Sequence, residues 1–381
     1  MAKVYRRVRP RAGKPDLVTY EARWREPDGR QRKRSFRKKS DAERYKTSIE
    51  SSLLTGGYVD PTRARVTVGA YAEQWMGGRT ALKPKTIASY RTLLNNRVLP
   101  RWGGVRLDRV TYEDVAAWVA EMSTALSPST TRQAYQLLTS MLDQAVKGRR
   151  LAMNPAAGVE LPRLPRKSRR YLSHEEVGRL ADACREDGII VLMLAYTGIR
   201  WGELAAIRVR CVAPGVRRIH IEEAMTEVDG KAVFGSPKTH ADRWVAIPGF
   251  LRDDISAVMA GKSPDDLLFT SPKGEVLRVG NFRRARFDRA TAGVGLVGLV
   301  PHELRHTAAS LAIASGANVK AVQSMLGHAS AAMTLDRYSH LFDDQLESVA
   351  DRLHEARERR AVPPLCPQGT VTTLADHAAG R

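Results

Sequence analysis

The spacing of apolar residues changes along the chain, and this change is the strongest constraint on how the chain can fold. Residues 17–36 alternate apolar and polar side chains like β-strands, whereas residues 66–150 repeat apolar residues at helical spacing. After residue 170, helical segments enclose a strand-rich stretch at 216–248. A chain of 381 residues is also too long for one typical core. The sequence therefore predicts a multidomain protein.

We expect a small β-rich N-terminal domain, then an all-α four-helix domain, then a mixed α+β domain that is mainly helical and holds a small antiparallel sheet. The stretch "NPAAGVELPRLPRKSRRYLS" is rich in proline and arginine, which is typical of a basic linker. The expected segments are a basic sheet-plus-helix domain at 1–57, a helical domain at 66–153, the linker at 154–172, the mixed domain at 173–345, and a tail helix with a flexible end at 346–381.

The charge of the chain indicates an anionic partner. There are 62 Lys and Arg against 41 Asp and Glu, a formal net charge of +21. Nucleic acid is the usual partner of such an excess, although a generally arginine-rich proteome is the alternative. Three scattered cysteines form neither a disulfide framework nor a zinc motif. No apolar run is long enough to span a membrane, and the N-terminus lacks an apolar signal core, so we expect a cytoplasmic protein.

The N-terminal segment is predicted to present basic side chains on a sheet. Asp28-Gly29 is a turn dipeptide between two strand-like runs, and a helix with Ser40 as its N-cap should follow. A solvated basic hairpin and a sheet laid against DNA are both compatible with this pattern. The candidate DNA-binding residues are Arg23, Arg25, Arg32 and Arg34.

The second segment reads as helices only. Pro84, Thr111 and Ser127-Pro128 provide start signals for three of its four helical runs. By itself this predicts a four-helix bundle with basic edges. Its candidate phosphate contacts, near helix starts or on polar faces, are Lys83, Lys85, Arg91 and Arg132.

The third domain carries chemistry in several short motifs. In "LAYTGIRWGELAAIR", a buried apolar helix ends at Gly198 and another begins near Arg200, so backbone N–H groups and a guanidinium can converge on one anion. Glu203 lies one turn on and could orient that arginine. In "PHELRHTAASLAIASG", His302 and Arg305 share a face of a helix that opens after Pro301.

Three further candidates complete the set. His328 follows a short helix that stops at Gly327, and Tyr338 is expected one turn into the next helix. Leu335 and Leu341 are expected to pack that helix, which leaves Tyr338 free for another task. "FGSPKTHADRWVAIP" predicts a β-hairpin with Lys238 in its turn.

This set suits phosphoryl transfer to a protein hydroxyl without a metal. Two arginines can neutralise the non-bridging oxygens, a histidine can handle the tyrosine proton, and a lysine can protonate a departing alkoxide. A tyrosine nucleophile would form a covalent ester that keeps the energy of the phosphodiester. The sequence has neither a Cys/His or carboxylate cluster typical of a metal site nor a glycine-rich phosphate loop.

The motifs "TGIRWGEL", "HELRHTAAS" and "LGHASAAMTLDRYSHL" resemble the three boxes of the tyrosine recombinase (phage integrase) family. The resemblance implies the following roles: Arg200 and Arg305 clamp the scissile phosphate, Glu203 supports them, His302 assists proton transfer, Lys238 is the general acid, His328 bonds the phosphate, and Tyr338 is the nucleophile. Lys231 and Lys273 are alternatives to Lys238, and His340 has no assigned role.

The same resemblance implies a core-binding, SAM-like helical domain and an arm-binding N-terminal domain. It implies an integrase that forms a 3′-phosphotyrosine and a Holliday junction, with no metal, cofactor or ATP. The expected partners are double-stranded DNA at core and arm attachment sites, three further copies in a tetramer, an excision factor and a host DNA-bending protein, at the nucleoid of a bacterial host.

Two other functions remain alternatives: a catalytically inactive DNA-binding accessory protein and a type IB topoisomerase. The intact residue set argues against the first, and the separate basic N-terminal domain argues against the second. The tail helix is expected to dock either on a neighbouring protomer or on its own domain.

Overall fold

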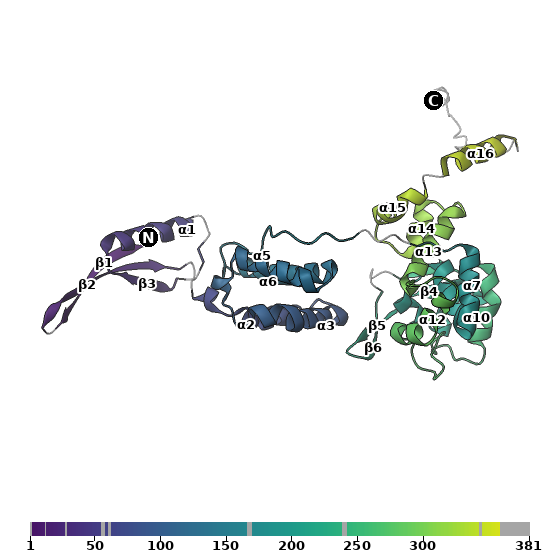
Figure 1. Ribbon diagram of the computed structural model, residues 1–381, viewed down its shortest axis with the longest axis horizontal. Coiled ribbons are helices and arrows are strands. Elements are labelled where there is room, and N and C mark those ends of the chain that lie inside the picture. Colours follow the sequence, from purple (N-terminus) through teal and green to yellow (C-terminus); the bar gives the residue numbers. More distant parts are fainter. Residues whose placement is uncertain are drawn as a thin grey trace, which may run out of the picture. The chain divides into compact units, whose positions relative to one another are not determined.

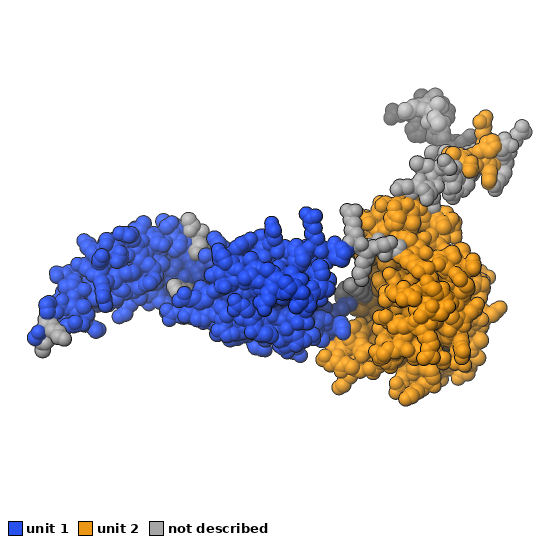
Figure 2. Space-filling view, in the orientation of Figure 1, with its two compact units in different colours: residues 1–166 blue, residues 167–381 orange. Residues whose placement is uncertain are grey.

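The chain forms two compact units, residues 1–166 and residues 167–381 (Figure 2). The computed structural model describes residues 2–11, 13–26, 29–54, 58–59, 62–165, 170–237, 242–342 and 345–358. The boundary between the units falls inside the segment that the sequence predicts as a linker. Within the described residues, no helix is long and apolar enough to cross a membrane.

The first unit begins with an antiparallel sheet in the order β1-β2-β3 (Figure 1). Its elements are β1 (Lys3–Arg11), β2 (Lys14–Arg25), β3 (Gln31–Phe36) and the following helix α1 (Lys39–Leu54). Trp24 and Ile49 are buried between sheet and helix, and the Trp24 indole donates to the Tyr58 hydroxyl at 3.0 Å. The predicted β-rich N-terminal region is therefore present, with its helix starting one residue before Ser40.

The strand register places the four candidate arginines on opposite faces of this sheet. Arg32 pairs with Trp24, so it lies on the face that α1 covers, and Arg34 shares that face. The Arg34 guanidinium carbon lies 4.8 Å from the ring centroid of Tyr45 on α1. Arg23 and Arg25 lie on the other face, so they are the two that face away from the helix.

The helices predicted for residues 66–150 are all present. They are α2 (Val68–Gly77), α3 (Pro84–Leu93), α4 (Leu99–Trp102), α5 (Tyr112–Ala125) and α6 (Pro128–Lys147). The side chains of Thr67, Thr111 and Ser127 cap α2, α5 and α6. Each accepts a hydrogen bond from the backbone N–H of the third residue of its helix. A π-helical turn, Leu94–Val98, joins α3 to α4 just before Pro100, which lacks the N–H that a continuous α-helix would use.

The first part of the predicted linker packs against these helices. Ala156 and Val159 are buried in the same core as Trp102 and Leu138. The Tyr135 hydroxyl donates to the Ala156 carbonyl at 2.5 Å, which fixes this extended segment on α6.

The described residues of the second unit are mainly helical and form two small antiparallel sheets (Figure 1). Its first helices are α7 (His174–Cys184), α8 (Gly188–Thr197) and α9 (Trp201–Leu204). The strands are β4 (Arg218–Ile221), β5 (Ala224–Val228), β6 (Lys231–Gly235) and β7 (Arg243–Ala246). The later helices are α10 (Arg252–Met259), α11 (Val279–Phe282), α12 (Asp288–Gly293), α13 (Pro301–Ala314), α14 (Val319–Leu326), α15 (Ala331–Tyr338) and α16 (Gln345–Glu358).

The hairpin predicted around Lys238 is wrong in its strand pairing. β6 pairs with β5 through the turn at Asp229-Gly230, and β7 pairs with β4 instead of β6. Ile219 of β4 and Val245 of β7 are register partners and both are buried, so burial of inward residues favours this pairing. Lys238 itself lies outside the described residues, in the connection between β6 and β7.

Candidate active site

Arg200 lies at a junction between two helices, as the sequence indicates. Gly198 ends α8 in the left-handed conformation, with φ +65°, and a Cβ there would lie 2.7 Å from Leu326. Arg200 is then the N-cap of α9, and its backbone N–H donates to a Glu203 carboxylate oxygen at 2.9 Å. The Arg200 guanidinium donates to the other oxygen at 2.7 Å.

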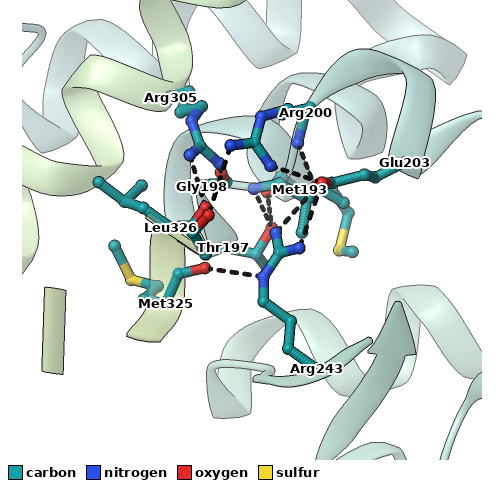
Figure 3. Close-up of polar contacts among 11 residues, drawn as sticks. Met193, Thr197, Gly198, Arg200, Glu203, Arg243, Arg305, Met325 and Leu326 are labelled. Atoms are coloured by element: carbon teal, nitrogen blue, oxygen red, sulfur yellow. Dashed lines mark hydrogen bonds and ion pairs between the residues drawn. The ribbon is translucent and has the colours of Figure 1, made fainter. Parts of the chain in front are cut away.

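Glu203 is buried, with 1% of its surface exposed, and two arginines satisfy its carboxylate (Figure 3). Arg243 on β7 donates to both oxygens, at 3.2 and 2.7 Å, in a two-pronged pairing. Burial by itself would raise the pKa of Glu203, but hydrogen bonds and charge from Arg243, and then Arg200, hold that pKa below its ordinary value. Glu203 therefore stays ionised at neutral pH and fixes both guanidinium groups.

Arg243 is a site residue that sequence reasoning missed. Its Nε donates to the Met325 carbonyl at 3.4 Å, so it also joins β7 to the end of α14. Gly327, with φ +61°, leaves space for it, because a Cβ there would lie 2.9 Å from that Nε. The signal in the sequence was an arginine at an inward position of a short strand, next to Trp244 in "RWVA".

Arg305 is nearly enclosed, with 3% of its surface exposed. Its guanidinium donates to the Gly198 carbonyl and, at 2.5 Å, to the Leu326 carbonyl (Figure 3). Burial lowers the pKa of Arg305 to about 9, and the positive charge of Arg200 adds to that effect. Arg200 also reaches the Gly327 carbonyl, at 3.5 Å, so both arginines converge on the end of α14.

His302 and His328 lie in different environments. His302 is exposed on α13, where partial desolvation and the charge of Arg305 lower the pKa of its imidazole. His328 is buried, and its Nδ1 lies 2.9 Å from the Thr334 hydroxyl. Burial lowers the pKa of His328 to about 4, and the charges of Arg305 and Arg337 act in the same direction. His328 is therefore uncharged at neutral pH.

Tyr338 is a core residue in this structure, contrary to the prediction that packing leaves it free. Its side chain is fully buried beside Ile313 and Leu326, while Leu335 is 41% exposed. It is the last residue of α15 and not one turn into that helix. The packing role predicted for Leu335 is thus wrong, because α15 turns its Thr334–Tyr338 face inward.

His306 is the second site residue that sequence reasoning missed. Its Nδ1 lies 2.7 Å from the Tyr338 hydroxyl oxygen. It also packs edge-on against His302, with ring centroids 5.4 Å apart. The signal was present in "HELRH", where His302 and His306 are four residues apart and so share a face of α13.

The remaining candidates are dispersed or not described. Lys238 lies outside the described residues; its alternative Lys231 begins β6, and Lys273 lies in an exposed turn.

Lys85 and Arg91 are exposed on α3, with Lys83 as its N-cap. Arg132 donates to the Pro162 carbonyl at 2.9 Å and so holds the chain that follows the helical core. His340, which had no role, lies 3.2 Å from the Tyr171 hydroxyl.

The chemistry of the site follows from its charge. Arg200 and Arg243 share the Glu203 carboxylate, and Arg305 bonds the carbonyls of Gly198 and Leu326, so three guanidinium groups and one carboxylate leave an excess of positive charge here. Such a cluster suits a phosphate, whose non-bridging oxygens need several fixed donors. Among the described residues, no group of three or more His, Cys, Asp and Glu side chains is arranged to hold a metal ion.

Comparison with known proteins supports a tyrosine recombinase type of enzyme. Residues 170–345 match the phage integrase family. The integrase of Mycobacterium phage FRAT1 is 29% identical over 299 residues, which are 76% of this chain and 88% of that protein. The tyrosine recombinase XerC of Mycobacterium leprae is 29% identical over 263 residues, 66% of this chain and 86% of that protein.

A solved structure shares the fold. The Tn1549 transposon integrase, in complex with transposon right end DNA, superposes with a TM-score of 0.66 at 20% identity and covers 76% of this chain and 100% of that chain. The chain therefore resembles phage integrases and other tyrosine recombinases, and its residues 170–345 carry the domain of that family.

Proposed function

We propose that this protein is an integrase that cuts and rejoins DNA through a covalent 3′-phosphotyrosine on Tyr338. The observation that carries the proposal is a fixed arginine cluster: Arg200 and Arg243 both bond the buried Glu203 carboxylate, and the buried Arg305 reaches the end of α14 as Arg200 does. These donors are held in place before substrate binds, so their orientation costs nothing when charge develops on the phosphate. The arginines take the place of a metal in neutralising that charge. No ATP is needed, because the tyrosine ester conserves the energy of the broken bond.

Each group has a distinct part in this mechanism. Arg200 and Arg305 bind the non-bridging oxygens of the scissile phosphate, and Glu203 orients Arg200. Lys238 protonates the departing 5′ oxygen. His328, uncharged at neutral pH, donates a hydrogen bond to the phosphate, and His302 assists proton transfer beside it.

The DNA is proposed to be held by several domains. We assign arm-site binding to residues 1–57, core-site binding to 66–153, a linker to 154–172, catalysis to 173–345 and a tail to 346–381. The sheet face turned away from α1 supports the first assignment, because it is strongly basic. Its basic residues are Lys3, Arg7, Arg9, Arg23, Arg25 and Lys33.

Four protomers would exchange strands in pairs through a Holliday junction and thereby integrate a phage or mobile element. An excision factor would reverse the reaction, and a host DNA-bending protein would bring arm and core sites together. The transposon right end DNA bound by the Tn1549 integrase supports DNA as the substrate of this chain.

Replacement of the nucleophile tests this function. Tyr338→Phe removes the attacking oxygen, so the variant should bind a core site yet form no covalent adduct on a nicked suicide substrate. Tyr171→Phe is the matched control, because it removes a tyrosine hydroxyl that also contacts a histidine, His340, and should cleave normally. Normal adduct formation by Tyr338→Phe would overturn the assignment.

A further inference from the structure

The Tyr338 hydroxyl is held by an imidazole that the family resemblance assigns no role. His306 Nδ1 lies 2.7 Å from the hydroxyl oxygen, and the two ring centroids are 5.8 Å apart. His306 follows Arg305 on α13, so one helix turns a guanidinium toward Gly198 and Leu326 and an imidazole toward Tyr338. His306 is therefore in direct contact with the proposed nucleophilic oxygen.

Burial makes this contact chemically important. The Tyr338 side chain has no exposed surface, so bulk water does not reach its hydroxyl to accept a proton. Among the described residues, the titratable or charged groups near this contact are His302 on the same helix, His328, whose ring stacks on the phenol with centroids 6.5 Å apart, Arg305 and Arg337. Nδ1 of His328 is engaged with Thr334, and His302 packs against His306.

We propose that His306 is the general base of the cleavage step, an inference that rests on the proposed function. Neutral His306, with its proton on Nε2, accepts the phenol proton at Nδ1 as the Tyr338 oxygen forms its bond to phosphorus. The bond from phosphorus to the 5′ oxygen breaks, and that oxygen takes a proton from Lys238. In rejoining, the imidazolium returns its proton to the tyrosine oxygen.

Single-turnover cleavage of a suicide substrate by the full-length protein tests the proposal. His306→Ala should cleave about 10²-fold more slowly near neutral pH, the low end of general-base contributions. His306→Gln, which keeps a hydrogen-bonding group but cannot carry the proton, should be equally slow. His340→Ala is the matched control, since it removes a histidine that contacts another tyrosine hydroxyl, and it should cleave at the unaltered rate.

Two further readouts separate proton transfer from a structural effect. The defect of His306→Ala should shrink as pH rises toward about 10, the ordinary pKa of tyrosine, because an ionised phenol needs no base. A substrate with sulfur in place of the 5′ oxygen has a leaving group that needs no acid, so it should restore Lys238→Ala but not His306→Ala.

A defect that stays constant with pH, restoration by glutamine, or restoration by the sulfur substrate would each overturn the role of His306. These outcomes differ from failure of the proposed function, which Tyr338→Phe reports independently. If Tyr338→Phe abolishes the adduct while His306→Ala cleaves normally, only the present inference fails. Binding of the same substrate and the thermal unfolding midpoint show that the variants are folded.

Discussion

Arginine serves two opposite purposes in the two units. On the N-terminal sheet, Arg25 is exposed on the face opposite α1, and Arg34 lies exposed over aromatic rings. In the second unit, Arg305 is almost fully buried, and its donors are aimed at backbone carbonyls. The arginines of the sheet keep their charge in water, where salt screens it and where the side chains can adjust to a flexible partner.

Burial of arginine costs desolvation energy, but it fixes the guanidinium groups in the geometry that the proposed phosphate site requires. Arg243, Arg200 and Glu203 hold one another through four hydrogen bonds, so their geometry is set before any anion arrives. Buried ion pairs of this kind add little net stability compared with apolar packing. The arginines of the second unit therefore hold their charge at fixed positions, whereas the arginines of the sheet suit long-range attraction of an anionic partner.

The largest effect is expected where burial is greatest. Arg305→Lys keeps the charge but cannot bridge the Gly198 and Leu326 carbonyls with one planar group, so cleavage should fall by about 10²- to 10³-fold. Single-turnover adduct formation measures this loss, and binding to the same duplex should change far less. A rate equal to that of the unaltered protein would show that burial of Arg305 has no catalytic purpose.

A smaller effect is expected for the arginine that holds the carboxylate. Arg243→Met removes two hydrogen bonds from buried Glu203 and should destabilise the second unit by roughly 3 kcal/mol, the size typical of breaking a buried pair. Urea unfolding measures this change. The matched control is Arg179→Met, which breaks an exposed pair with Glu175 at 3.8 Å and should cost about 0.5 kcal/mol or less. Equal losses in the two variants would remove the distinction between buried and exposed pairs.

The smallest effect is expected on the sheet. Arg25→Ala should lower the dependence of duplex binding on salt by about 0.9 in the logarithmic slope if Arg25 neutralises one phosphate. Arg34→Ala, on the face that α1 covers, should leave that slope unchanged. Titration of a random-sequence duplex at several salt concentrations compares them, and identical slopes would contradict the assignment of the open face to DNA.

The local elements were predictable because their signals are local. Thr111 and Ser127 cap their helices where the sequence places them, and Gly198 and Gly327 end α8 and α14. The helix junction at Arg200 was predictable for the same reason, because neighbouring residues determine both the left-handed glycine and the new N-cap.

The pairing of strands and the inward turn of α15 were not predictable in this way. β7 pairs with β4, which is more than twenty residues away in sequence, because the core buries Ile219 and Val245 together. Tyr338, and not Leu335, points inward because α15 packs beside Ile313 and Leu326. Periodicity within one short helix does not specify which neighbour will cover it.

The sequence by itself determined the family motifs, the succession of strand-like and helical segments, and the identity of most proposed catalytic groups. Only the tertiary structure shows that Arg243 donates hydrogen bonds to Glu203 and that the His306 imidazole contacts the Tyr338 hydroxyl. The physical reason is distance along the chain: Glu203 and Arg243 are 40 residues apart, and His306 and Tyr338 are 32 apart. Contacts of that kind exist only once the core has brought the helices and strands together.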